Sequence, residues 1–328
     1  MRVACQHCPR GCVLEENQRG YCFIRQNVGG RIVCSAYGRT TGLCVDPIEK
    51  KPLWHFLPGS KALSLGSIGC NLGCVFCQNW TISHARDDAL LDVLATPTDV
   101  AHTALRYACE SVAFTYNEPT TWSEYAIEIA KECKKLRVKC VAITSGYINP
   151  EPRKAFFATL DAVNIDLKGF SENFYEKYCL GRLAPVLDTI EWCAKETNVW
   201  LELTNLLIPR ANDSNDDIRR MCAWIVEHVG QDVPLHFSAF YPKFKLVDRL
   251  PTPWKTLKSA HDIAKSEGLR FVYLGNVHAP AYEATWCPRC DQMVVGREGY
   301  RISHLALEAG RCGACGFRLP GVWESHEE

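Results

Sequence analysis

The sequence predicts an α/β fold in which parallel strands and helices alternate to form a partial barrel. Short apolar runs, each too brief for a helix, recur through the middle of the chain, and amphipathic stretches with helical periodicity separate them. Strand and helix alternation of this kind implies parallel strands with crossover connections, which favours a barrel over a sandwich. A doubly wound open sheet is the competing arrangement, but no glycine-rich dinucleotide fingerprint opens the first unit.

The strand signals are rich in aliphatic or aromatic residues. They span residues 62–65, 112–116, 141–144, 162–166, 199–205, 235–240 and 271–274. Apolar positions at helical spacing run from Trp122 to Leu136 and from Ile218 to Val229, and Asn212, Asp213 or Ser214 can cap the second helix. Six or seven units are fewer than the roughly eight of a closed barrel, so we expect a partial, TIM-like (β/α)6 barrel.

Composition divides the chain into three segments. We expect a four-cysteine metal-binding segment and a solvated linker at 1–60, the partial barrel at 61–280, and a four-cysteine zinc ribbon at 281–328. Lys and Arg together equal Asp and Glu at 37 each, so no overall positive field draws the protein onto nucleic acid or anionic membrane. No apolar run approaches the ~20 residues of a membrane span, and the start lacks a secretory apolar region, which predicts a cytoplasmic protein.

Three closely spaced cysteines are the most informative motif. Cys70, Cys74 and Cys77 follow the first predicted strand in the pattern C-x3-C-x2-C. Four-iron clusters normally take four cysteine ligands, so three thiolates predict a cluster with one iron open to an exogenous ligand. A zinc site completed by His84 is the alternative, although zinc sites usually have two C-x2-C pairs or histidines that complete four ligands.

Two further cysteine clusters lie near the ends of the chain. The pairs Cys287/Cys290 and Cys312/Cys315 have the spacing of a zinc ribbon with four thiolates. The other set has irregular spacing that suits zinc or an auxiliary four-iron cluster, with a slight preference for zinc, and comprises Cys5, Cys8, Cys12 and Cys22. The remaining cysteines mostly lie in apolar runs and are assigned no chemistry.

Polar residues gather where predicted strands end. In a barrel these carboxyl ends meet on one face, so we expect the side chains there to share one site. The candidates are Asn117, Glu118, Thr144, Ser145, Asp166, Lys168 and His236. Simpler roles remain open: a helix-entry turn at Glu118, a surface ion pair of Asp166 with Lys168, and a core position for His236.

Four motifs give a family resemblance. Cys70-Asn-Leu-Gly-Cys-Val-Phe-Cys-Gln-Asn-Trp80, Tyr116-Asn-Glu-Pro119, Asn164-Ile-Asp-Leu-Lys168 and Leu207-Ile-Pro209 resemble the radical S-adenosylmethionine superfamily, in the branch around pyruvate formate-lyase activating enzyme. The run from Asp46 to Phe56, with the flanking cysteine clusters, is similar to AmmeMemoRadiSam system enzymes. The resemblance covers nearly the whole chain.

The resemblance implies a partial barrel with a [4Fe-4S] cluster on Cys70, Cys74 and Cys77 and S-adenosylmethionine on its open iron. It implies that Asn117 and Glu118 receive the cofactor ammonium, although both glycines of the family's Gly-Gly-Glu segment are absent here. The other implied cofactor contacts are the methionine contacts Asp166 and Lys168, the turn residues Thr144 and Ser145, Phe76 against adenine, and His236 near the ribose.

The implied activity is that of a radical oxidoreductase. An electron from a donor such as flavodoxin or ferredoxin would cleave the cofactor and give a 5′-deoxyadenosyl radical that abstracts hydrogen from a protein, RNA or other substrate; glycyl-radical activation is one such outcome. We expect a macromolecular substrate or partner protein. The alternative is a non-catalytic iron-sulfur and zinc scaffold or redox sensor. A zinc hydrolase is weaker, because no His-rich or Glu-x-x-His pattern is present.

Overall fold

One curved sheet forms the centre of the molecule. The computed structural model describes residues 1–324, and its main sheet has the order β14-β13-β12-β11-β10-β9-β7-β6. All neighbours are parallel except β6, which is antiparallel to β7. The strands are β6 (Leu43–Pro47), β7 (Lys61–Leu65), β9 (Ser111–Phe114), β10 (Lys139–Thr144), β11 (Ala162–Asp166), β12 (Trp200–Leu207), β13 (Leu235–Ala239) and β14 (Val272–Gly275).

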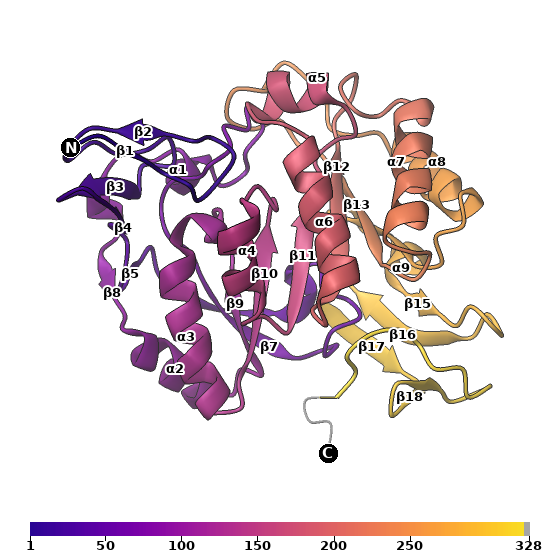
Figure 1. Cartoon of the computed structure of the whole chain (residues 1–328). Helices are drawn as coiled ribbons and strands as arrows, with labels where there is room; N and C mark the ends of the chain where they lie inside the picture. The colour runs from indigo at the N-terminus through magenta and orange to yellow at the C-terminus, as the bar shows by residue number, and fades with distance from the viewer. Residues whose placement is uncertain (325–328) are drawn as a thin grey trace.

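Helices connect the parallel strands in the predicted alternation. α3, α4 and α6 lie in front of the strands in Figure 1, and α7 and α8 continue the layer toward the right. The longer helices are α2 (Pro97–Arg106), α3 (Ser123–Lys135), α4 (Pro150–Phe157), α6 (Ala184–Glu196), α7 (Asn215–His228) and α8 (Trp254–Ser266). Ser214 caps α7 by accepting a hydrogen bond from the backbone N of Asp217. Within residues 1–324, no helix is long and apolar enough to cross a membrane.

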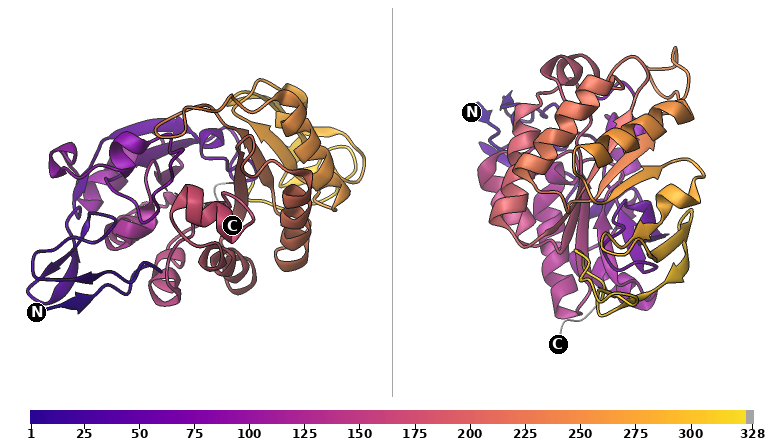
Figure 2. Two further views of the ribbon diagram at one scale, coloured as in Figure 1. Left: turned by 90° about the horizontal axis from the view of Figure 1, so that it is seen from above. Right: turned by 90° about the vertical axis from the view of Figure 1, so that its right-hand side faces the viewer.

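The fold prediction is confirmed. Each predicted strand run coincides with a parallel strand, and six helical crossovers lead from β7 to β14. The two edge strands, β6 and β14, do not pair with each other in the described chain, so the barrel is partial, and its curvature is visible from above in Figure 2. Strand β6 was not predicted, since it lies in the segment expected to precede the barrel.

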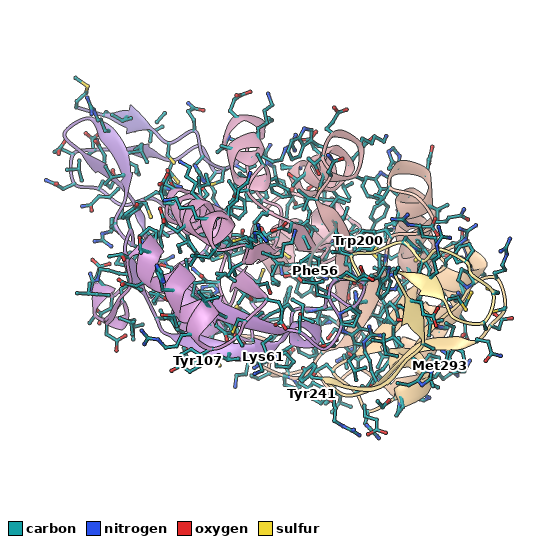
Figure 3. The ribbon with its side chains drawn as sticks, turned by 90° about the horizontal axis from the view of Figure 1, so that it is seen from below. Phe56, Lys61, Tyr107, Trp200, Tyr241 and Met293 are labelled. Atoms are coloured by element: carbon teal, nitrogen blue, oxygen red, sulfur yellow. The ribbon has the colours of Figure 1, made fainter. Side chains whose placement is uncertain are left out.

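The residues after β6 form a buried floor beneath the sheet. Leu53 and Phe56 are completely buried, and with Ile48, which opens the short 3-10 helix η1 (Ile48–Lys50), they pack against the first residues of several strands. Seen from below in Figure 3, Phe56 lies centrally, with Trp200 nearby. The expectation of a solvated linker is therefore wrong for this stretch.

Two charged side chains are buried in this floor, and only one of them has an ion-pair partner. Lys51, 2% exposed, pairs with Asp46 at 2.7 Å. The Oε1 atom of Glu49 accepts a hydrogen bond from the backbone N of Gly59, whereas its Oε2 atom has no hydrogen-bond partner among the described residues, and burial raises the pKa of this carboxyl. Burying paired charges is tolerated, whereas an unpaired charge would be costly. The charged composition of this segment therefore suggested a solvated linker, although the segment is part of the core.

The N-terminal segment packs beside the carboxyl ends of the first strands. It contains two antiparallel hairpins, and a third pair joins it to the loop before α2. The buried side chain of Arg25 donates a hydrogen bond to the carbonyl of Thr121 and pairs with Glu124, which fixes the segment to the start of α3. These short strands are β1 (Val3–Ala4), β2 (Val13–Leu14), β3 (Arg25–Val28), β4 (Arg31–Cys34), β5 (Arg39–Thr40) and β8 (Val93–Leu94).

The C-terminal segment covers the β14 edge and the floor. Its strands are β15 (Thr285–Trp286), β16 (Met293–Glu298), β17 (Arg301–Leu305), β18 (Leu307–Glu308) and β19 (Arg311–Cys312), preceded by α9 (Pro280–Glu283). Trp54 packs with Phe271, Tyr273 and the buried tail residue Val294 in one apolar cluster. Because this cluster combines floor, edge strand and tail, the tail is part of the barrel's support.

Candidate active site

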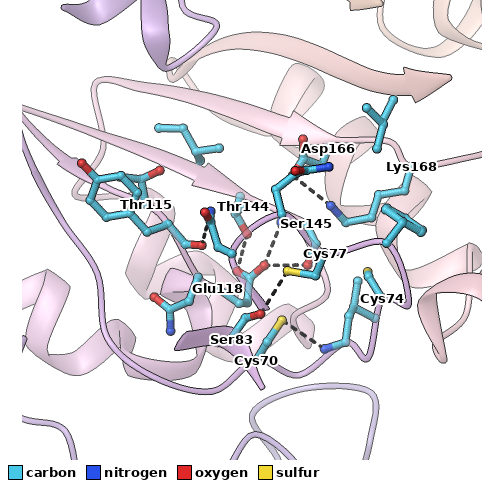
Figure 4. Close-up of a pocket in the computed structure, with 18 of the residues that line it drawn as sticks. Cys70, Cys74, Cys77, Ser83, Thr115, Glu118, Thr144, Ser145, Asp166 and Lys168 are labelled. Atoms are coloured by element: carbon cyan, nitrogen blue, oxygen red, sulfur yellow. Dashed lines mark hydrogen bonds and ion pairs between the residues drawn. The ribbon is translucent and has the colours of Figure 1, made fainter. Parts of the chain in front are cut away.

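The loop after β7 carries the three predicted thiols into a cavity of about 280 Å³ at the carboxyl ends of the strands (Figure 4). Cys70, Cys74 and Cys77 all line this cavity. The hydroxyl of Ser83, at the end of the short helix α1 (Trp80–Ser83), lies 3.0 Å from the Sγ atom of Cys77. Burial raises the pKa of Cys70 and Cys77, so metal binding at these thiols must release protons.

Two glycines let the loop pass close to the N-terminal segment. Gly69 has a φ of +74°, and a Cβ atom there would lie 1.9 Å from the carbonyl oxygen of Cys22. A Cβ atom on Gly73 would lie 2.2 Å from the hydroxyl of Tyr21. A side chain at residue 69 would displace the backbone of the N-terminal segment, whereas one at residue 73 would displace the Tyr21 side chain.

Glu118 places a buried carboxylate on the other side of the cavity. It caps the 3-10 helix η3 (Pro119–Trp122), where its Oε1 atom accepts hydrogen bonds from the backbone N of Thr120 at 3.1 Å and the hydroxyl of Thr144 at 2.5 Å. Its Oε2 atom accepts hydrogen bonds from the backbone N and hydroxyl of Ser145, at 2.8 and 2.6 Å. The helix-entry role and the cavity position are therefore combined in one residue.

Asn117 has a supporting position beside Glu118. Its amide nitrogen donates hydrogen bonds to the carbonyls of Ile68 and Gly69, and its carbonyl oxygen accepts one from the backbone N of Ser67. It also lines the cavity. Its amide is thus occupied in holding the cysteine loop, while Tyr116 before it adopts a positive φ of 69°, a strained conformation for a non-glycine residue.

Asp166 and Lys168 form an ion pair in the same cavity. The Nζ atom of Lys168 lies 3.0 Å from the Oδ2 atom of Asp166, and the Lys168 side chain is 18% exposed. Burial alone would lower the pKa of Lys168, but the charges of Asp166, Cys74 and Cys179 together raise it well above its ordinary value. The cavity therefore holds a fixed ammonium close to the thiols, opposite the carboxylate of Glu118.

The donor set fits the implied cofactors. Soft thiolates suit an iron-sulfur cluster, a carboxylate suits an ammonium, and an ammonium suits a carboxylate. The hydroxyl of Thr204 lines the cavity, and it is buried without a hydrogen-bond partner among the residues described, so it is available to a bound molecule. These groups would hold an amino acid-bearing cofactor beside the cluster.

Phe76 and His236 differ in position. Phe76 lines the cavity, as expected, and packs against Phe174 with the ring centroids 6.1 Å apart. His236 does not line it: its Nε2 atom lies 2.7 Å from the fully buried Glu202, below the cavity. Ser238, two residues along the same face of β13, reaches the cavity instead. The expected ribose contact of His236 is thus replaced by a core position.

Cys179 is a site neighbour that sequence reasoning missed. It ends the π-helix η4 (Tyr175–Cys179), and its carbonyl accepts a hydrogen bond from the backbone N of Gly73. A hydrogen bond from its thiol, together with the charge of Lys168, lowers the pKa of Cys74 despite burial. Cys179 lies far from the cysteine motif along the chain, so no spacing signal pointed to it.

The two outer cysteine sets differ in geometry. In the tail, the Sγ atoms of Cys287 and Cys315 are 3.5 Å apart and those of Cys290 and Cys312 are 3.7 Å apart, and all four lie within 4.8 Å of one another. The N-terminal set surrounds a small cavity instead, lined by Cys5, Cys8, Cys12 and Cys22. The tail thiols thus form one tight group, and the N-terminal thiols line one cavity.

The fold and site define an α/β partial-barrel protein that presents three thiols and a pair of opposite charges in one cavity at the strand ends. Residues 65–224 match the family described as the radical SAM superfamily. An uncharacterized protein of Methanocaldococcus jannaschii is 41% identical over 320 residues, which cover 97% of this chain and 95% of the relative. The chain belongs to the radical SAM superfamily.

Solved structures of low sequence identity share the fold. A radical SAM methyltransferase from Sphaerobacter thermophilus matches with a TM-score of 0.52 and 13% identity over 67% of each chain. SuiB of Streptococcus suis, solved with its precursor peptide SuiA, matches with a TM-score of 0.52 and 14% identity, over 70% of this chain and 52% of SuiB. Membership of the superfamily implies cleavage of S-adenosylmethionine at a [4Fe-4S] cluster, as the resemblance predicted. The narrower branch still rests on the motifs.

Proposed function

We propose that this protein is a radical oxidoreductase that abstracts hydrogen from a macromolecular substrate after cleaving S-adenosylmethionine. The observation that carries the proposal is the meeting of the three thiols, Glu118 and the pair of Asp166 with Lys168 in one cavity. When bound, the cluster and cofactor would supply a 5′-deoxyadenosyl radical. The protein's own residues bind and orient the cofactor and exclude water.

Glu118 and Lys168 would orient the two ends of the methionine moiety. Four hydrogen bonds already fill the acceptor positions of Glu118, two from fixed backbone groups and two from hydroxyls that rotate. A cofactor ammonium would therefore displace a hydroxyl donor of Thr144 or Ser145. Lys168 would receive the carboxylate while keeping Asp166 as its partner.

The cavity rim supports a macromolecular substrate. Trp80 follows the cysteine loop and stacks on Phe244, with the ring centroids 5.2 Å apart, and Gln78 of the cavity wall bonds to the carbonyl of Tyr241. Trp80 is 39% exposed and Tyr241 is 44% exposed, and Leu250 further along the same segment is 80% exposed. Exposed aromatic and aliphatic groups next to a catalytic cavity suit contact with a large partner. A glycyl-radical protein is one such substrate.

We also propose zinc for the tail. Thiolates about 2.3 Å from one tetrahedral zinc ion lie roughly 3.8 Å from each other. The paired tail distances of 3.5 and 3.7 Å are close to this value. The metal would then stabilise the segment that packs on the floor and β14.

Anaerobic turnover tests the proposed activity. Protein with a reconstituted cluster is incubated with dithionite and S-adenosylmethionine, and 5′-deoxyadenosine and methionine are measured. We expect both products from the wild type and neither from Cys74→Ala, while Cys109→Ala, which changes a cysteine outside the cavity, retains activity. A correctly assembled cluster that yields no 5′-deoxyadenosine would favour the scaffold or redox-sensor alternative.

A further inference from the structure

The N-terminal cysteines do not have the geometry of the tail site. Within residues 1–324, the tail thiols are the only set of three or more His, Cys, Asp or Glu ligand atoms that all lie within 4.8 Å of one another. Cys5, Cys8, Cys12 and Cys22 therefore line their cavity with wider separations. A cubane cluster carries its thiolates on separate irons, so they stand farther apart than thiolates on a single zinc ion.

The cysteine loop of the active site provides an internal comparison. Cys70, Cys74 and Cys77 surround a cavity and likewise exceed the close separation of the tail thiols. The N-terminal set thus resembles the superfamily's cluster site in lining a cavity and in lacking the tight grouping of the tail thiols. It has four thiols rather than three, which is the full ligand complement of a four-iron cluster.

The N-terminal site is also in contact with the active-site loop. The carbonyl of Cys22 reaches Gly69, the residue before Cys70, and the Tyr21 hydroxyl reaches Gly73, the residue before Cys74. The Nε atom of Arg10 donates a hydrogen bond of 2.7 Å to the carbonyl of Asn71. One backbone contact therefore separates a ligand of the N-terminal site from a ligand of the active-site cluster.

Exposure gives the N-terminal site an inner and an outer side. Cys5 and Cys22 are 5% and 6% exposed, whereas Cys8 and Cys12 are partly exposed. The buried side includes the cysteine that contacts the active-site loop. The outer side is accessible to a protein that docks from solvent.

We propose that Cys5, Cys8, Cys12 and Cys22 hold a second [4Fe-4S] cluster, through which electrons enter the active site. A low-potential ferredoxin or flavodoxin would give up one electron and reduce this cluster by one electron. The cluster would pass that electron to the one on Cys70, Cys74 and Cys77 and return to its oxidised level. Electron transfer to the active-site cluster rests on the proposed function, whereas the presence of a [4Fe-4S] cluster on the N-terminal cysteines does not.

Metal and sulfide analysis tests the second cluster without any turnover. Anaerobically reconstituted wild type should contain ~8 iron and ~8 sulfide ions per chain, and the triple variant Cys70→Ala, Cys74→Ala, Cys77→Ala should retain ~4 of each. Adding Cys8→Ala and Cys12→Ala to the triple variant should remove the remaining iron. Wild type with ~4 iron ions and two zinc ions per chain would overturn the proposal. The wild-type count does not depend on whether any variant folds.

Reduction kinetics test the electron path. Cys8→Ser with Cys12→Ser should slow reduction of the active-site cluster by reduced flavodoxin at least ~10-fold, as followed by electron paramagnetic resonance, while reduction by dithionite is retained. The matched control is Cys287→Ser with Cys290→Ser, which alters the other outer site and should keep the flavodoxin rate. An unchanged rate in the Cys8/Cys12 variant would overturn the relay. Both outcomes are read without S-adenosylmethionine, so they are separate from a failure of the proposed activity.

Discussion

Ser145 donates two hydrogen bonds to Glu118, from its backbone N at 2.8 Å and from its hydroxyl at 2.6 Å. This pair joins the segments that follow two neighbouring parallel strands, β9 and β10, on one wall of the cavity. The carboxylate is thereby held in one orientation without the glycines that the family segment carries. Glu118 is the residue on which cofactor binding should depend most among the polar groups of the site.

Glu118→Gln should weaken binding of S-adenosylmethionine by roughly 10- to 100-fold, because hydrogen bonds to a charged group contribute about 1.5–3 kcal/mol. Cofactor affinity is measured by equilibrium dialysis on protein of verified iron content. Glu128→Gln on the partly exposed face of α3 is the matched control and should bind normally. Equal affinity in the two variants would remove Glu118 from the cofactor site.

Asp46→Ala should destabilise the protein by about 3–5 kcal/mol, because Lys51 would remain buried without its partner. The double variant Asp46→Ala, Lys51→Met should lose less stability than Asp46→Ala and Lys51→Met lose as single variants combined. Anaerobic denaturant unfolding measures both. The exposed pair of Glu151 with Lys154 is the control, where Glu151→Ala should cost no more than ~1 kcal/mol. A cost for Asp46→Ala as small as this would show that the floor tolerates a free charge.

The stability of the floor should depend on pH through His55. Burial lowers the pKa of His55 to about 4, against an ordinary value of 6.5. Its Nδ1 atom lies 2.7 Å from the carbonyl of Pro320 and its Nε2 atom 2.6 Å from the hydroxyl of Tyr273. Between these pH values the unfolded chain binds a proton that the folded protein does not. The stability that neutral, buried His55 contributes to the folded state is therefore complete above pH 6.5, and it is lost as the pH falls from 6.5 to 4.

This loss should amount to at most about 3 kcal/mol, and unfolding free energies measured from pH 7 to pH 4.5 should show it. His55→Gln should flatten the dependence in this range. His102→Gln, at an exposed position of α2, should leave the dependence as it is in the wild type. Parallel curves for wild type and His55→Gln would contradict the assignment.

Removal of the metal proposed for the tail should loosen the floor and leave the active-site cluster in place. Cys287→Ser with Cys290→Ser should lower Tm by several degrees, since the tail supplies the backbone hydrogen bonds from Leu57 to Val322 and from Val322 to His55. Differential scanning calorimetry and zinc analysis check this. If the variant lacks zinc and its Tm is unchanged, the metal does not stabilise the floor.

The barrel was predictable because each of its strands is a short apolar run of its own. Ala162 to Asp166 matches β11 from end to end, because Ala162, Val163 and Ile165 are short-range apolar signals and only Asn164 interrupts them before the terminal Asp166. Strand β6 was missed because Leu43–Pro47 includes Cys, Asp and Pro and pairs only along one edge. The sequence of a strand shows its own apolar pattern, but it does not show which sheet edge the strand will pair with.

The site was predictable where spacing or motif carries the chemistry, as for the three cysteines and Glu118. Positions that depend on partners far away in the sequence could not be predicted. His236 was assigned to the cofactor because nothing local shows that the buried Glu202 lies 2.7 Å away, or that Glu202 also accepts hydrogen bonds from the backbone of Trp54 and His55. The hydrogen bond between Cys179 and Cys74 likewise joins residues far apart along the chain, so the sequence did not predict it.

The isolated bridge between Phe56 and Val322 joins residues that lie far apart along the chain. During synthesis, Phe56 leaves the ribosome long before the segment that completes its surroundings. The underside of the nascent barrel therefore stays uncovered until the segment around Val322 has been made. Truncation of the chain before Val322 should thus produce an aggregation-prone product rather than a smaller working enzyme.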